Sequence, residues 1–161
     1  MLAAGFRLAE IGFVKELRLI PATIGFLILA SISAQAESGW LTDYPEAQQL
    51  AKAKQKLVLL NFTGSDWCGW CIKLDREVFS KPEFHQYAEK NLVLVEIDFP
   101  RRKEQTASLK QQNAKLAEQY EIQGFPTIIV LDSNGKKVGE LGYLPGGPPA
   151  FIAELEKLSK G

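Results

Sequence analysis

Cysteine, histidine and methionine are all scarce in this chain. Its 161 residues contain two cysteines, one histidine and one methionine. Two cysteines are too few for a disulfide-stapled miniprotein or for a four-cysteine zinc site. The single histidine, His85, has no second histidine or cysteine–histidine cluster to complete a zinc site, so we expect a surface residue and no bound metal. The two cysteines are therefore expected to act as a pair.

The chain also lacks an excess of positive or negative charge. The chain has 19 basic and 19 acidic residues, so no overall positive field would attract nucleic acid. It has no glycine-rich phosphate loop and no dinucleotide fingerprint, and we expect no cofactor. Hydrophobic residues make up 46% and charged residues 24%, which excludes a disordered chain and a multi-span membrane protein. The length indicates one domain with modest additions.

The N-terminal region has the pattern of a secretory signal peptide. Leu19–Ala36 is uncharged and mostly apolar, and it ends in the small-x-small pattern of Ala34-Gln35-Ala36. Three basic residues precede it: Arg7, Lys15 and Arg18. We expect cleavage before Glu37, giving a signal peptide at 1–36 and an exported domain at 37–161. An uncleaved membrane anchor is the alternative, because the run is barely long enough to span a bilayer.

Apolar runs alternate with helical patterns along the rest of the chain. Strands are predicted at Leu57–Phe62, Leu92–Ile97, Thr127–Leu131 and Lys137–Leu141. Helices are predicted at Glu46–Lys54, Cys71–Tyr87, Ala107–Tyr120 and Ala150–Leu158. A break is expected at Ser80, a lead-in at Trp40–Pro45, and a hairpin turn at Asp132–Gly135. This alternation predicts an α/β fold with a partly parallel sheet that ends in an antiparallel hairpin.

The two cysteines lie three positions apart, between a predicted strand and a predicted helix. Cys68 is expected at the helix N-terminus, where free amides and the helix dipole stabilise a thiolate. Cys71 is expected one turn further along the same face, within reach of a disulfide. The spacing thus predicts an exposed nucleophile and a more buried resolving thiol. A purely structural disulfide is the alternative, although so short a loop restrains the unfolded chain little.

Two sequence motifs resemble those of the thioredoxin family and occur in the same order. The resemblance extends from about Glu46 to Leu158. Trp67, Cys68, Gly69, Trp70 and Cys71 resemble the family's redox motif. Gly124-Phe125-Pro126-Thr127 resembles the loop that holds a cis-proline facing the cysteines. The longer string Phe62–Cys68 is similar to exported bacterial thioredoxin-like proteins described as thiol-disulfide reductases. The resemblance implies a thioredoxin-like fold, with a central mixed sheet flanked by helices and a short insertion before the cis-proline loop.

The resemblance also implies roles for individual residues. Pro126 would be cis and would shape the substrate groove, while Phe125 would offer backbone groups to a bound peptide strand. Trp70 stands where many relatives have proline or histidine, and would be exposed beside the active site. The segment between Phe99 and Lys115 is longer than the compact family form needs. Its Arg101-Arg102-Lys103 run either borders the substrate groove or is a solvated charge run.

One departure from the family concerns proton transfer. Thioredoxins carry a buried acid on the strand before the motif, which handles the proton of the resolving thiol. Asn61 occupies that place here, and an amide cannot accept a proton. Glu96, in the middle of the next apolar strand, is the best substitute, because a buried acid is costly without a role or a partner. Alternatively, Glu96 faces water at a strand end. Asp66 is nearer in sequence but is expected to be solvated.

The leading functional hypothesis is an exported, periplasmic thiol-disulfide oxidoreductase, a monomer acting on substrate proteins with disulfides. Cys68 attacks the substrate disulfide, and Cys71 resolves the mixed disulfide. Gly69-Trp70 supplies no charge to stabilise the reduced thiolate, which favours a reductase or electron relay over an oxidase or isomerase. Electrons would come from a partner protein, possibly in the membrane. The alternatives are a copper-handling module that uses both thiolates and a non-catalytic binding domain with a residual disulfide.

Overall fold

The computed structural model describes residues 39–160, so the predicted signal peptide at 1–36 lies outside the described part. The elements are β1 (Trp40–Leu41), α1 (Tyr44–Lys54), β2 (Leu57–Thr63), α2 (Gly69–Leu74), a π-helical turn (Asp75–Phe79), α3 (Pro82–Asn91), β3 (Leu92–Asp98), α4 (Ala107–Gln119), β4 (Thr127–Leu131), β5 (Lys137–Leu141) and α5 (Gly147–Leu158). Within residues 39–160, no helix combines the length and apolarity needed to cross a bilayer.

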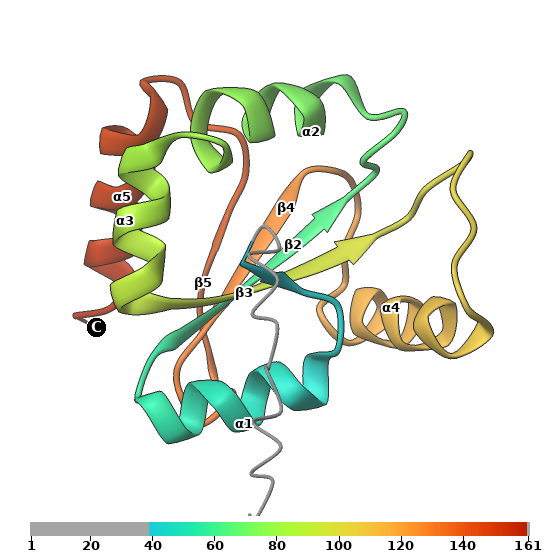
Figure 1. The fold of residues 1–161 in the computed structure, drawn as a ribbon, viewed down its shortest axis with the longest axis horizontal. Helices are drawn as coiled ribbons and strands as arrows, with labels where there is room; N and C mark the ends of the chain where they lie inside the picture. Colours follow the sequence, from blue (N-terminus) through green and yellow to red (C-terminus); the bar gives the residue numbers. More distant parts are fainter. Residues whose placement is uncertain (1–38, 161) are drawn as a thin grey trace, which may run out of the picture. The chain divides into compact units, whose positions relative to one another are not determined.

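A five-stranded mixed sheet forms the centre of the domain, in the order β1-β3-β2-β4-β5 (Figure 1). β3 runs parallel to both β1 and β2, whereas β4 runs antiparallel to β2 and to β5. The β4–β5 turn is held by the Asp132 carboxylate, which accepts hydrogen bonds from the amides of Asn134 and Lys136, with Gly135 at a φ of 87°. The predicted α/β fold with a closing antiparallel hairpin is confirmed.

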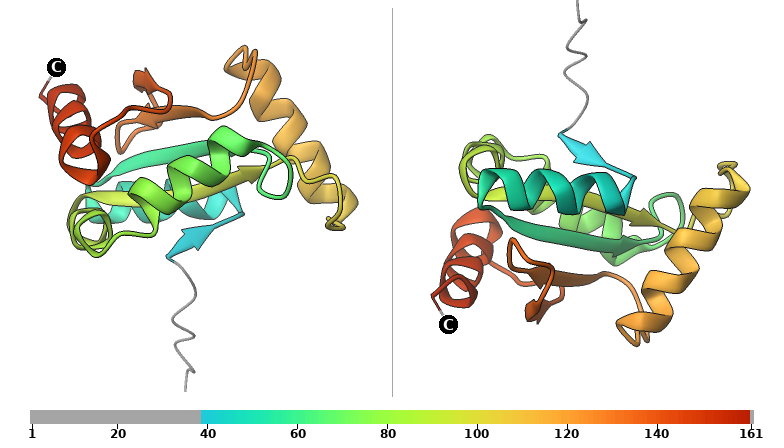
Figure 2. Two further views of the ribbon diagram at one scale, coloured as in Figure 1. Left: turned by 90° about the horizontal axis from the view of Figure 1, so that it is seen from above. Right: turned by 90° about the horizontal axis from the view of Figure 1, so that it is seen from below.

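Helices cover both faces of the sheet (Figure 2). On one face, α1 and α4 pack on inward residues of β2 such as Val58, Leu60 and Phe62. On the other face, α2, α3 and α5 pack around Phe79, Phe84 and other apolar side chains. Alternate residues of a strand point to opposite faces, so Leu59 joins this second layer, and Asn61 lies two residues further along the same face.

Several element boundaries differ from the sequence prediction, and the helix predicted at Cys71–Tyr87 begins at Gly69 and, after its break, continues to Asn91. The lead-in contains a short strand, β1, whose Trp40 pairs with Leu94 at the sheet edge. Two residues are too few for a hydrophobic period to reveal such a strand. The first helix begins at Tyr44, after an Asp43 side chain that caps the Glu46 amide. The last helix begins at Gly147, because prolines are accommodated in a first helical turn. The break at Ser80 is present, between the π-helical turn and α3.

Candidate active site

The two cysteines lie at the carboxyl end of β2, where the chain turns into α2. Cys68 is the N-cap residue of α2, and its Sγ accepts a hydrogen bond from the Cys71 amide at 3.2 Å. The two residues form a disulfide, with their Cα atoms 5.2 Å apart. The extended φ and ψ of Cys68, −84° and 105°, place its sulfur against the free amides of the helix start.

The exposure of the two cysteines differs less than the sequence analysis predicted. Cys68 is 7% exposed and Cys71 is 5% exposed, so neither is open to solvent in this disulfide-bonded state. Each sulfur covers part of the other, which lowers the exposure of both. The asymmetry between the cysteines lies instead in their neighbours, because Cys71 lines a cleft beneath α2 whereas Cys68 does not.

Trp67 connects the redox motif to the loop that holds Pro126. Its Nε1 donates to the carbonyl oxygen of Phe99 at 2.8 Å. Its ring meets the Phe125 ring edge-on, with centroids 5.9 Å apart, and Phe125 stacks on Phe99 at 5.2 Å. The three aromatic residues join the ends of β2 and β3 to the segment before β4.

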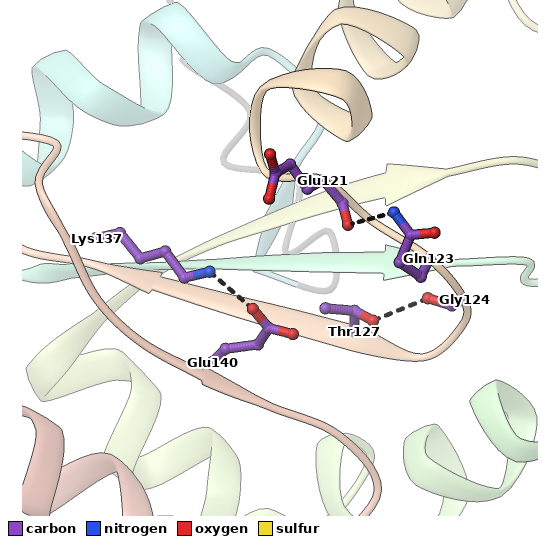
Figure 3. Close-up of polar contacts among 6 residues, drawn as sticks. All are labelled: Glu121, Gln123, Gly124, Thr127, Lys137 and Glu140. Atoms are coloured by element: carbon purple, nitrogen blue, oxygen red, sulfur yellow. Dashed lines mark hydrogen bonds and ion pairs between the residues drawn. The ribbon is translucent and has the colours of Figure 1, made fainter.

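The Phe125–Pro126 peptide bond is cis, as the resemblance implied. On the β4 side of the bond, the Thr127 hydroxyl donates to the Gly124 carbonyl at 2.8 Å (Figure 3). Figure 3 also shows the approach from α4, where Gln123 Nε2 donates to the Glu121 carbonyl at 3.1 Å. Short-range hydrogen bonds thus stabilise the chain before and after the Phe125–Pro126 bond.

Gly69 and Trp70 form the exposed first turn of α2 between the cysteines. Trp70 is 58% exposed, and its ring lies 5.2 Å from the ring of Tyr143. Lys73 Nζ lies over both rings, 4.9 Å and 4.8 Å from their centroids. The Tyr143 hydroxyl donates to Glu77 at 2.6 Å, and this hydrogen bond lowers the pKa of the Glu77 carboxyl. Tyr143 belongs to no recognisable sequence motif, so its position beside the dithiol was not expected from the sequence.

Glu96 and Asn61 lie side by side under α2. They are register partners on β3 and β2, and both line the cleft of about 450 Å³ that also contains Cys71. Asn61 Oδ1 is buried, with no hydrogen-bond partner among residues 39–160. Burial raises the pKa of the half-buried Glu96 carboxyl, the negative charge of Asp98 raises it further, and Lys103 opposes both effects. Glu96 thus faces the same cleft as the resolving cysteine, rather than water at a strand end.

Asp66 is open to solvent, as expected, and its carboxylate is also hydrogen-bonded. It accepts from the amides of Arg101 and Arg102 at 3.0 Å and 2.7 Å. These backbone hydrogen bonds, with that of Arg101 the strongest influence, hold the pKa of Asp66 below its usual range. The loop after β3 therefore lies against the turn that leads to Cys68, which no local sequence pattern indicated.

A second carboxylate holds the same turn. Asp98 is buried at the end of β3, and it accepts from the Ser65 amide at 2.9 Å and from the Ser65 hydroxyl at 2.6 Å. Lys103 Nζ donates to the same hydroxyl at 3.2 Å. Sequence reasoning missed both Asp98 and Ser65, although an acid at the end of an apolar strand was a usable indication.

His85 is exposed on α3 and borders the cleft that contains Cys71. Within residues 39–160, no three side chains of the histidine, cysteine, aspartate or glutamate types gather closely enough to hold a metal ion.

Comparisons with known proteins agree with this geometry. The thioredoxin-like domain family matches residues 44–159. "Disulfide bond reductase DsbH" of Chlamydia pneumoniae is 36% identical over 132 residues, covering 82% of this chain and 76% of the relative. "Thioredoxin-related protein DsbJ" of the same organism is 29% identical over 80% of this chain, which spans only 38% of that relative. A solved structure described as "DsbH Oxidoreductase" superposes with a TM-score of 0.72 at 37% identity, covering 75% of this chain and 83% of that one.

Proposed function

Because this chain belongs to the thioredoxin-like domain family, we propose that it reduces disulfides in exported proteins through Cys68 and Cys71. Homology to a disulfide bond reductase makes it a thiol-disulfide oxidoreductase; the reducing direction and the exported location belong to the proposal. The observation that carries the proposal is a disulfide at the start of α2, beside a cis-proline loop and an acid-lined cleft.

The reaction begins with the reduced protein. The Cys68 thiolate attacks one sulfur of a substrate disulfide, forming a mixed disulfide and releasing the other substrate sulfur as a thiolate. The free amides at the start of α2 stabilise the attacking thiolate, since the Cys68 sulfur already accepts the Cys71 amide. The Phe125–Pro126 turn and the exposed Trp70 border the place where the substrate chain would lie.

Resolution of the mixed disulfide requires the thiol of Cys71 to lose its proton. Glu96 lies in the cleft that Cys71 lines, and burial raises the pKa of its carboxyl, which makes the carboxylate a stronger base for that proton. The Cys71 thiolate then attacks the Cys68 sulfur, which releases the second substrate sulfur and restores the Cys68–Cys71 disulfide. Substrate gains two electrons and the protein loses two, so a donor protein must reduce the pair again.

Two features support the reducing direction. Gly69 and Trp70 place no charged group between the cysteines, so nothing in that turn stabilises the reduced thiolate strongly enough to make the disulfide a powerful oxidant. A homologue 36% identical to this chain is described as a disulfide bond reductase. We therefore expect a reduction potential nearer the thioredoxin value of about −270 mV than the strong-oxidant value of about −120 mV.

Equilibration of the purified protein against glutathione tests the direction. A potential above about −180 mV, the level of protein disulfide isomerase, would contradict a reductase and favour an oxidase or isomerase. Insulin reduction with metal analysis of the same sample separates turnover from copper handling. A Cys71→Ser variant, which cannot resolve the mixed disulfide, would trap the physiological substrates covalently on Cys68.

A further inference from the structure

The loop after β3 carries three consecutive cations beside the dithiol. Arg101, Arg102 and Lys103 are all exposed. Asp66 accepts hydrogen bonds from the backbone amides of both arginines, which fixes the position of the loop against the turn that precedes Cys68. The backbone of this segment therefore holds its charged side chains beside the turn that leads to Cys68.

Arg101 lies directly against the redox motif. The central carbon of its guanidinium is 3.9 Å from the centre of the Trp67 ring, and Trp67 immediately precedes Cys68. Trp67 is itself held by the carbonyl of Phe99 and by the ring of Phe125. A guanidinium stacked on an aromatic ring keeps its N–H groups at the edges free to donate, so Arg101 can still bind a carboxylate.

The side chains of this loop form no ion pair within residues 39–160. Ion pairs among residues 39–160 involve Arg76, Lys137 and Lys157, but none of the three cations beside the dithiol. The Asp66 carboxylate is occupied by backbone amides, and Lys103 Nζ donates to the neutral hydroxyl of Ser65. The exposed charged side chains of this segment are Arg101, Arg102, Lys103 and Glu104, whereas the nearby carboxylate of Asp98 is buried against Ser65.

The opposite flank of the dithiol has a different character. There, Trp70 is an exposed aromatic side chain, and Lys73 Nζ lies over the rings of Trp70 and Tyr143. A substrate chain that reaches Cys68 therefore meets an aromatic flank on the α2 side and a cationic flank on the side of Trp67.

Building on the proposed function, we infer that the cationic loop Arg101–Lys103 selects protein substrates in which acidic residues flank the target disulfide. Carboxylates on the substrate would pair with the exposed guanidinium groups of the loop while Cys68 attacks the neighbouring sulfur. Exposed pairs of this kind are individually weak and are screened by salt, so the selection acts on the rate of encounter and is largest at low ionic strength.

The test uses pre-reduced full-length protein and three synthetic peptides. Each peptide contains one intramolecular disulfide with the same loop sequence, and the flanks carry glutamate, glutamine or lysine pairs. Second-order rate constants for peptide reduction are measured at about 20 mM and about 300 mM salt. We expect the glutamate peptide to react about fivefold faster than the glutamine peptide at low salt, and this ratio to fall towards one at high salt.

Two variants locate the source of the preference. Arg101→Gln combined with Arg102→Gln should bring the glutamate-to-glutamine ratio close to one at low salt. The matched control is Lys52→Gln with Lys54→Gln, which removes the same charge from the far end of α1, beside the start of β2. This control should keep the wild-type ratio, because its charges lie at the opposite end of the strand from Cys68.

Equal rate constants for all three peptides on wild-type protein would overturn this inference, while reduction of the glutamine peptide would still uphold the proposed function. Failure to reduce any peptide would contradict the proposed function itself. A preference that survives in the double arginine variant would show that the guanidinium groups of Arg101 and Arg102 do not bind the substrate carboxylates, and would also overturn the inference.

Discussion

At the scale of single residues, the active site depends on which sulfur and which carboxylate carry charge. Cys68 accepts an amide hydrogen bond at the start of α2, whereas Cys71 lines a cleft with Glu96 and Asn61. The first environment stabilises a thiolate by dipoles, and the second supplies a group that can take a proton. The two cysteines therefore differ in chemistry although their exposures in the disulfide are nearly equal.

Alkylation of the reduced protein should modify Cys68 before Cys71 at mildly acidic pH. The reason is that only the thiolate reacts, and the helix start favours the thiolate of Cys68. Mass spectrometry of peptides after a short iodoacetamide pulse gives the order directly. Preferential labelling of Cys71 would reverse the assignment of nucleophile and resolving thiol.

Replacement of Glu96 by glutamine should slow resolution of the mixed disulfide by about tenfold near neutral pH, because the amide cannot accept the Cys71 proton. Release of the second peptide thiol after rapid mixing measures this step separately from the first attack. Glu118→Gln, an exposed change on α4, serves as the charge-matched control. Identical resolution rates in wild type and Glu96→Gln would exclude Glu96 from the mechanism.

The same variant should change how stability depends on pH. Burial raises the pKa of Glu96 above its ordinary value of 4.5, so the folded protein binds this proton more tightly than the unfolded chain. The resulting penalty on folding is absent below pH 4.5 and grows as pH rises through the raised value. The unfolding free energy of Glu96→Gln relative to wild type should therefore increase between about pH 4 and pH 8. Urea midpoints of the oxidised proteins measure it, and a flat difference would refute the assigned environment.

At the scale of elements, the turn between β2 and α2 is fixed by groups from other parts of the chain. Asp98 holds Ser65 from the end of β3, and Asp66 binds the loop that follows that strand. Trp67 lies so close to Gly64 that a Cβ there would be 2.5 Å from the indole. This glycine is required by a close approach, not by an unusual backbone angle.

Gly64→Ala should lower the unfolding free energy by about 1–3 kcal/mol, because the added methyl must displace a ring held by Phe99 and Phe125. Gly69→Ala is the matched substitution, since a Cβ there has nothing within 4 Å. It should change stability by less than about 1 kcal/mol. Denaturant unfolding measures the change in unfolding free energy of both variants. Equal changes would show that the Trp67 ring shifts at little cost.

At the scale of the whole molecule, the two faces of the sheet differ in what they contain. The layer with α1 and α4 is closed by an apolar cluster that includes Phe62 and Leu116. The layer with α2, α3 and α5 contains a similar apolar cluster but ends in the polar cleft at Cys71. Reaction chemistry is thus confined to the carboxyl ends of β2 and β3 on one face.

The proposed export predicts which residue begins the mature chain. If residues 1–36 are a cleaved signal peptide, protein recovered from the cell envelope should begin at Glu37. N-terminal sequencing or intact mass measurement of the envelope fraction tests this. A mass that includes residues 1–36 would instead support an uncleaved anchor.

Features that depend on neighbours along the chain could be predicted from the sequence. A cysteine pair three residues apart after an apolar run predicted the dithiol at a helix start, and Asp132–Gly135 predicted a hairpin turn. The proline loop was expected from its resemblance to a known motif. These features are local, because a helix cap or a tight turn is decided by a few consecutive residues.

Which distant side chains come into contact depends on the folding of the whole domain. The register of β2 against β3 placed Glu96 beside Asn61, and packing brought Arg101 onto Trp67 and Tyr143 beside Trp70. A shift of one residue in strand register would turn Glu96 to the opposite face, away from Cys71. Such contacts depend on the pairing of strands and the closure of loops over long sequence separations, which no local pattern specifies.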